Sequence, residues 1–231
     1  MGAHPHGWWI LLHLVLFVFW LGGDLGVYVS SRYVLRAELP FAARATALRI
    51  MGILDLGPKI CLVLFLPSGV TLMALEPHGA EAVLNGWTVA AAWAGAACWL
   101  WVTVADHHRP GRRPWVRRAD WTARIAVTTA LLGVAAYTLA ASEPFGVATE
   151  PRWLGAKVAL YAAAIACGLG IRLTLRPFGP AFATLGTKGS TPATERALRR
   201  AVDGCVPYVV AIWCCVLGAA VLGVLKPGAN L

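Results

Sequence analysis

The sequence predicts an all-α integral membrane protein: a bundle of six transmembrane helices with both termini on the extracytoplasmic side. Only 13% of the 231 residues are charged and 58% are hydrophobic, whereas a soluble domain carries about 25% charged residues. Six apolar segments each reach the length of about 20 helical residues that crosses a bilayer. The connections between these segments alternate between basic and nearly free of Lys and Arg.

The apolar segments form a single predicted domain, residues 1–231, with spans at 8–30, 52–75, 86–106, 120–141, 153–175 and 203–225. The first span contains Asp24, which costs about 3 kcal/mol to insert. Each of its thirteen Ile, Leu, Phe and Val residues favours insertion by about 0.3–0.6 kcal/mol, so the segment still inserts. Residues 40–50 have an amphipathic pattern and predict a short interfacial helix before the second span.

Charge in the connections predicts the orientation. The connections 31–50, 107–118 and 176–202 contain four, five and five Lys or Arg residues, whereas 76–85 contains none and 142–152 contains one. Basic connections stay in the cytoplasm by the positive-inside rule. We therefore expect a multi-pass protein of a bacterial-type cytoplasmic (inner) membrane, with the lipid bilayer as its main partner. The net charge of +9 reflects this orientation and not nucleic-acid binding.

Ionisable residues inside spans are costly and mark candidate functional sites. The outer half contains His13 and Lys157, which lie at similar depths when counted from the extracytoplasmic ends of their spans. Neutral imidazole is a common ligand of haem iron and copper. A buried Lys can act as a base or a ligand, or stay charged beside a carboxylate. The alternatives are a hydrogen bond from His13 to a neighbouring helix, and a Lys157 side chain that extends to the headgroups.

The inner half contains Asp24, Asp55, Lys59 and Asp203, which we expect to form an intramembrane ion network. Asp55 and Lys59 are four residues apart and lie on one helix face. The network would either lock the first, second and sixth spans together or conduct protons or cations. Asp24 is therefore a candidate catalytic residue, together with Lys157.

Three histidines near the extracytoplasmic side suggest copper. If Met1 is removed, His4 becomes the third residue, and the amine, two amides and the imidazole can bind Cu(II) in a square plane. His6 and His78 are predicted on the same side and, with His13, complete the candidate metal ligands.

Several segments resemble one membrane-protein superfamily. They are His13 followed by Trp20-Leu21-Gly22, the run Trp153-Leu154-Gly155-Ala156-Lys157, and the ending Leu225-Lys226-Pro227. In these features the chain resembles the HemJ-type protoporphyrinogen oxidases and the copper-resistance D (CopD-like) membrane proteins. The resemblance implies that His13 and Lys157 take part in haem binding and activity.

These observations lead to three hypotheses. The first is a membrane protein that binds haem b or a similar redox cofactor in its outer half. As an oxidoreductase, it would exchange electrons with a quinone or another membrane carrier. The second is a copper-handling permease for import or resistance. The third is a non-catalytic subunit of a membrane complex.

Overall fold

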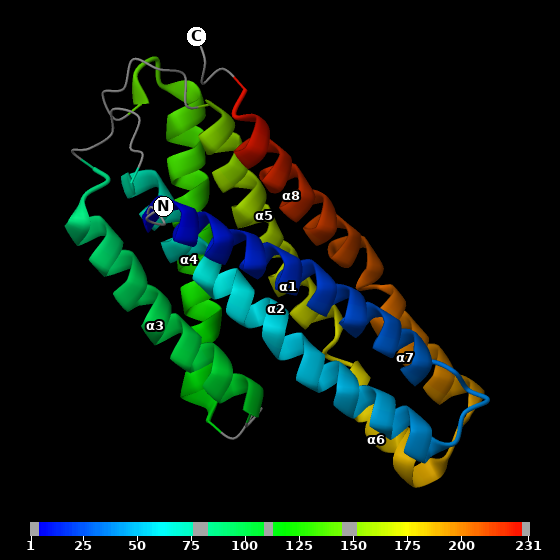
Figure 1. Cartoon of the computed structure of the whole chain (residues 1–231). Helices are drawn as coiled ribbons and strands as arrows, with labels where there is room; N and C mark the ends of the chain where they lie inside the picture. The colour runs from blue at the N-terminus through cyan, green and yellow to red at the C-terminus, as the bar shows by residue number, and fades with distance from the viewer. Residues whose placement is uncertain (1–4, 76–82, 109–112, 145–151, 228–231) are drawn as a thin grey trace.

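The computed structural model describes residues 5–75, 83–108, 113–144 and 152–227, and these residues contain eight α-helices and no β-strand (Figure 1). The prediction of an all-α fold is therefore confirmed. The helices are α1 (Pro5–Val34), α2 (Phe41–Leu75), α3 (Gly86–His108), α4 (Pro114–Ala140), α5 (Arg152–Thr174), α6 (Phe178–Lys188), α7 (Pro192–Asp203) and α8 (Val206–Leu225).

Among the described residues, six helices are long and apolar enough to cross a membrane: α1 to α5 and the helix that ends with α8. Each covers one of the six predicted apolar segments. With 35 residues at about 1.5 Å per residue, α2 is about 52 Å long, well beyond a bilayer core of about 30 Å. Residues 40–50 do not form a separate interfacial helix. They are the first turns of this long helix, because nothing in their sequence interrupts the hydrogen-bond ladder.

The six long helices form a ring in chain order. Neighbours along the chain pack against each other, α5 packs against α8, and α8 touches α1. The helix α1 begins and α8 ends at the same end of the bundle, which we call the termini end (Figure 1). The short helices α6 and α7 lie at the opposite end, which we call the hairpin end.

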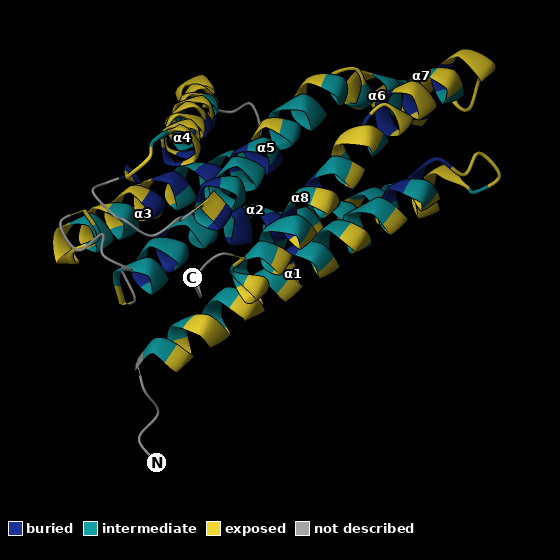
Figure 2. Ribbon diagram, turned by 90° about the horizontal axis from the view of Figure 1, so that it is seen from above, coloured by how far each residue is buried: buried dark blue, intermediate teal, exposed yellow. Residues whose placement is uncertain are grey.

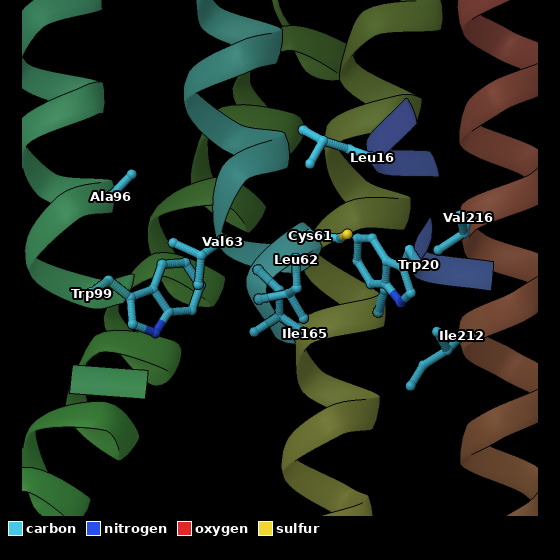
Figure 3. Packing of buried hydrophobic residues seen from close by; sticks show 11 residues of the cluster. Leu16, Trp20, Cys61, Leu62, Val63, Ala96, Trp99, Ile165, Ile212 and Val216 are labelled. Atoms are coloured by element: carbon cyan, nitrogen blue, oxygen red, sulfur yellow. The ribbon is translucent and has the colours of Figure 1, made fainter. Parts of the chain in front are cut away.

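The core lies where the long helices meet. Trp20 of α1, Val63 of α2, Trp99 of α3, Ile165 of α5 and Val216 of α8 belong to one buried cluster (Figure 3). Residues exposed to the surroundings cover the outward faces of the helices (Figure 2). Many of them are large and apolar, such as Trp87, Ile53 and Val224, which are 86%, 69% and 77% exposed. Such a surface suits lipid, where apolar side chains incur no solvation penalty.

The predicted connection 176–202 contains helices α6 and α7, and the last span begins at Val206 instead of residue 203. Pro207 explains the break between α7 and α8. Its ring would clash with the carbonyl group four residues earlier, which belongs to Asp203. The helix accordingly ends at Asp203 and restarts after Gly204 and Cys205.

A buried ion pair joins the α6–α7 hairpin to the first two helices. The Arg44 side chain is 1% exposed; its Nε donates to the carbonyl oxygen of Val34 at 2.7 Å, and its two terminal nitrogens donate to Glu195 at 2.7 and 3.0 Å. These hydrogen bonds hold the pKa of the Glu195 carboxyl below its ordinary value. A second apolar cluster, around Leu35 and Leu198, packs beside the pair. With five charged residues in twelve, α7 is too polar for hydrocarbon.

Replacing Glu195 by Gln should lower the free energy of unfolding by about 1.5–3 kcal/mol, because the Arg44 charge stays buried without its carboxylate. The pKa of Glu195 is lowered on folding, so its contribution is complete above the ordinary glutamate pKa. The contribution disappears as the pH falls from there through the lowered value. Denaturation in detergent micelles across a pH series measures both effects. Glu38→Gln, at an exposed carboxylate of the same end, is the control; equal losses in the two variants would contradict the assignment.

Candidate functional site

His13 lies between α1 and α2, in the half of the bundle nearer the termini end. Its Nδ1 atom is 2.9 Å from the hydroxyl oxygen of Ser68. The edge of its ring packs against Phe65, with ring centroids 4.5 Å apart. Gly69 lies beside the ring: a Cβ there would be 3.7 Å from the His13 ring, an ordinary contact distance.

Ser68 binds one nitrogen of His13 and leaves the other for a ligand. The Ser68 hydroxyl lies 3.1 Å from the carbonyl oxygen of Phe65 and can donate its only proton there. In that arrangement the Ser68 oxygen accepts from His13, and the proton of the neutral ring lies on Nδ1. The lone pair then lies on Nε2, which is the nitrogen available to a ligand. In metal sites, histidine ligands almost always donate their other ring N–H in this way.

Lys157 comes from the first turns of α5, which packs against α4 and α8. Its Nζ atom packs on the backbone of α8, where a Cβ at Gly223 would lie 2.7 Å from it. Its charge acts on the His13 imidazole, so the two residues share one region of the interior. The link between the two predicted outer residues is this electrostatic interaction, and no hydrogen bond joins their side chains.

Aromatic rings continue inward from His13. Trp20 lies with its ring centroid 5.3 Å from that of Phe65 and 6.4 Å from that of Tyr161. The Tyr161 hydroxyl donates to the carbonyl oxygen of Leu62. These contacts join α1, α2 and α5, and they pack aromatic rings around the Tyr161 hydroxyl, which has a hydrogen-bond partner.

The inner group lies closer to the hairpin end. Asp55 and Lys59 form the ion pair that their four-residue spacing predicts. The Nδ1 atom of His107, from the end of α3, lies 3.9 Å from the Asp55 carboxylate. Asp24 interacts electrostatically with Asp55. Its helix approaches α2 closely here, since a Cβ at Gly23 would lie only 2.7 Å from Pro58.

Asp203 is not part of this inner group, which corrects the predicted network. It accepts a hydrogen bond from Arg32 at 2.7 Å, and its side chain is 50% exposed. Arg32 is eight residues beyond Asp24 on α1, a rise of about 12 Å, so Asp203 lies at a different level. The physical reason is the helix break before Pro207, which leaves Asp203 at the end of α7 instead of inside a span.

A second polar cluster, which the sequence analysis did not identify, centres on Asp120 of α4. The carboxylate is fully buried and accepts from Arg124 at 3.0 Å, Arg172 at 2.6 Å, Thr103 at 2.9 Å and Trp99 at 3.3 Å. These partners come from α3, α4 and α5. Asp120 and Arg124 are four residues apart within a predicted span, and that spacing was the signal available in the sequence.

The candidate copper ligands stay predictions. His4 and His78 lie outside the described residues, and His6 is the second residue of α1. Within the described residues, no group of three or more His, Cys, Asp or Glu side chains is arranged to hold a metal ion. His13 is therefore placed as a single potential ligand and not as part of a protein-only metal cage.

Replacing Asp120 by Asn should destabilise the protein by about 3–5 kcal/mol, because the buried guanidinium of Arg124 and the partly buried one of Arg172 lose their shared carboxylate. Asp106→Asn is the matched change, since this carboxylate lies 3.8 Å from Arg172. It should cost less than about 1 kcal/mol. Unfolding in mixed detergent micelles measures the difference, and equal costs would show that Asp120 does not organise the cluster.

The site geometry is the basis for assigning a function, because similarity to known proteins supplies none. Comparisons of the chain with protein-family models, with curated proteins and with solved structures find no match.

Proposed function

We propose that this membrane protein binds haem b or a similar redox cofactor in the half of the bundle nearer its termini, with His13 as the axial ligand. One observation carries the proposal: Ser68 holds His13 at Nδ1, at 2.9 Å, so that Nε2 is the nitrogen left for a ligand. An imidazole held at one nitrogen among aromatic neighbours has the donor chemistry that haem iron takes from proteins. The resemblance of the His13 and Lys157 segments to HemJ-type and CopD-like proteins agrees with this function.

Lys157 has a role that suits the same ligand. Its ammonium group lies near His13 and can hold a carboxylate of the cofactor or act as a second ligand once deprotonated. The mostly buried position of Lys157 between α5 and α8 makes a bound anion more favourable than it would be in water. Lys157 would thus orient the ligand, while His13 would determine its affinity.

Bound haem would supply one-electron redox chemistry, which makes a membrane oxidoreductase the enzyme class of the proposal. The basic hairpin end would face the cytoplasm, so that both termini and the His13 site would lie toward the extracytoplasmic side of a bacterial-type inner membrane. The electron partner would be a lipid-soluble carrier such as a quinone. Asp24, with Asp55 and Lys59 beneath it, would be the candidate group for moving protons on the cytoplasmic side.

The copper permease and the non-catalytic subunit are the alternatives that the experiments distinguish. A copper permease predicts that copper tolerance depends on His4, His6 or His78. A non-catalytic subunit predicts co-purifying partners and no cofactor. No contact among the described residues favours either one over a His13 ligand site.

Protein purified after expression with adequate haem should show a Soret band, and His13→Ala should abolish it because the axial ligand is lost. His108→Ala is the control, since His108 is exposed at the end of α3. The measurement is the absorption spectrum together with metal analysis. A wild-type protein without a Soret band, or an unchanged band in His13→Ala, would rule out the proposal.

Ser68→Ala should weaken haem binding by about 10- to 100-fold while a His-ligated band remains at high haem concentration, because the ligand is present but no longer oriented. Ser31→Ala is the matched control: this serine donates only within its own helix, to the carbonyl oxygen of Tyr28. Haem titration of the apoprotein gives the affinities. Equal affinities of the two variants would argue against an orienting role for Ser68.

A further inference from the structure

The helices α1 and α2 approach each other closely around Asp24. A Cβ at Gly23 would lie 2.7 Å from the Pro58 ring, and a Cβ at Gly26 would lie 2.9 Å from the Leu54 side chain. Asp24 follows Gly23 directly, so it lies at the level of α2 between Leu54 and Pro58. Asp24 is partly buried at this contact, where the neighbouring helix supplies much of its surroundings.

Pro58 leaves a hydrogen-bond acceptor in α2 at the same level. Proline has no N–H group, so the carbonyl oxygen of Leu54 receives no helical hydrogen bond from position 58. A backbone carbonyl without a donor is costly within a membrane. A neutral carboxylic acid has an O–H donor, whereas a carboxylate has none. The protonated form of Asp24 is therefore the form that can supply the missing donor.

The charges around Asp24 also favour its protonated form. Asp55 acts electrostatically on Asp24, and no cation pairs with Asp24 in the described part of the chain. The ammonium group of Lys59 forms its ion pair with Asp55 instead. Two neighbouring carboxylates do not both ionise readily, so the one without a counter-charge takes up the proton. The hydrogen bond between Trp20 and Asp24 is compatible with this form, because a carboxylic acid still accepts through its other oxygen.

Asp55 lies at the surface of the membrane at the hairpin end. Its carboxylate is 3.9 Å from Nδ1 of His107, which is the second-last residue of the membrane-spanning helix α3. The side chains of Asp55 and Lys59 are 38% and 26% exposed. Water at this end of the bundle therefore reaches Asp55, which stands between that water and Asp24.

We propose that Asp24 is a proton-binding site that is neutral in the cofactor-free protein and exchanges its proton with water at the hairpin end through Asp55. Asp55 takes one proton from water and passes it to the Asp24 carboxylate; release is the reverse, and the charge of Asp55 is restored each time. The site deepens the candidate proton role of Asp24, since it assigns where the proton is held and where it enters. Its use in redox chemistry rests on the proposed function, whereas proton binding requires no cofactor.

The first measurement is the infrared spectrum of the haem-free protein in lipid nanodiscs at neutral pH. A protonated carboxyl group has a C=O stretching band that is separate from the bands of carboxylates and of the backbone. We expect such a band to shift on ¹³C labelling of aspartate and to be absent in Asp24→Asn. In Asp24→Glu, which keeps an acid, the band should no longer respond to aspartate labelling. A wild type without a protonated aspartate, or a labelled band that remains in either variant, would overturn the proposal.

The second measurement is the rate at which this band shifts when the water is replaced by D₂O. The double variant Asp55→Asn/Lys59→Gln removes the ion pair as a unit, so that Lys59 does not become a counter-charge for Asp24. It should slow the exchange at least about 10-fold, because the side chain that transfers the proton is lost. Asp106→Asn is the control, since this carboxylate near the end of α3 lies beside Arg172, and its rate should equal that of the wild type.

Equal exchange rates in the double variant and the wild type would overturn the route through Asp55. Both measurements are made without haem, so a failure of haem binding to His13 leaves them unaffected. In the same way, an ionised Asp24 would leave the His13 proposal standing.

Discussion

A polar side chain inside this bundle can find a partner only within the protein, because the hydrocarbon of a bilayer offers none. This constraint explains why the ionisable residues of the spans lie between helices. It also explains which helices are joined: Ser68 joins α2 to His13 of α1, and the Asp120 cluster joins α3, α4 and α5. The lipid-facing surface only has to be apolar, so its residues hardly restrict how the helices pack. The polar contacts therefore specify how the long helices are arranged.

The polar sites differ in whether every hydrogen-bond donor and acceptor has a partner. The Asp120 carboxylate accepts from four donors and has a structural role. His13 has its Nδ1 bonded to Ser68, and its Nε2 has no hydrogen-bond partner among the described contacts. Arg124 similarly keeps one donor without an acceptor. A donor or acceptor without a partner is costly inside a membrane. A ligand that supplies the missing hydrogen bond or coordinate bond therefore binds most favourably at such a site. The His13 region is such a place.

The helices could be predicted from the sequence because apolar length alone decides which segments cross a bilayer. The structure of residues 176–202 could not be predicted from apolar length, because the α6–α7 hairpin depends on tertiary contacts such as the ion pair between Arg44 and Glu195. Asp203 shows a related difficulty: its apparent depth assumed a continuous span, and the Pro207 break moved it to the bundle end. Pairing within one helix, as for Asp55 and Lys59, follows from spacing. Pairing between helices, as for Asp120 with Arg172, requires the rotation of each helix, which periodicity in a uniformly apolar segment does not define.

The account therefore depends on an unprotonated nitrogen: Nε2 of His13 must present a lone pair toward the bundle interior. Solid-state NMR of the haem-free protein with ¹⁵N-labelled histidine tests this directly, with the His13 signals identified by their absence in His13→Gln. We expect a neutral ring with the proton on Nδ1, and a loss of that preference in Ser68→Ala. A proton on Nε2 in the wild type would contradict the account, because the nitrogen assigned to the ligand would then be occupied.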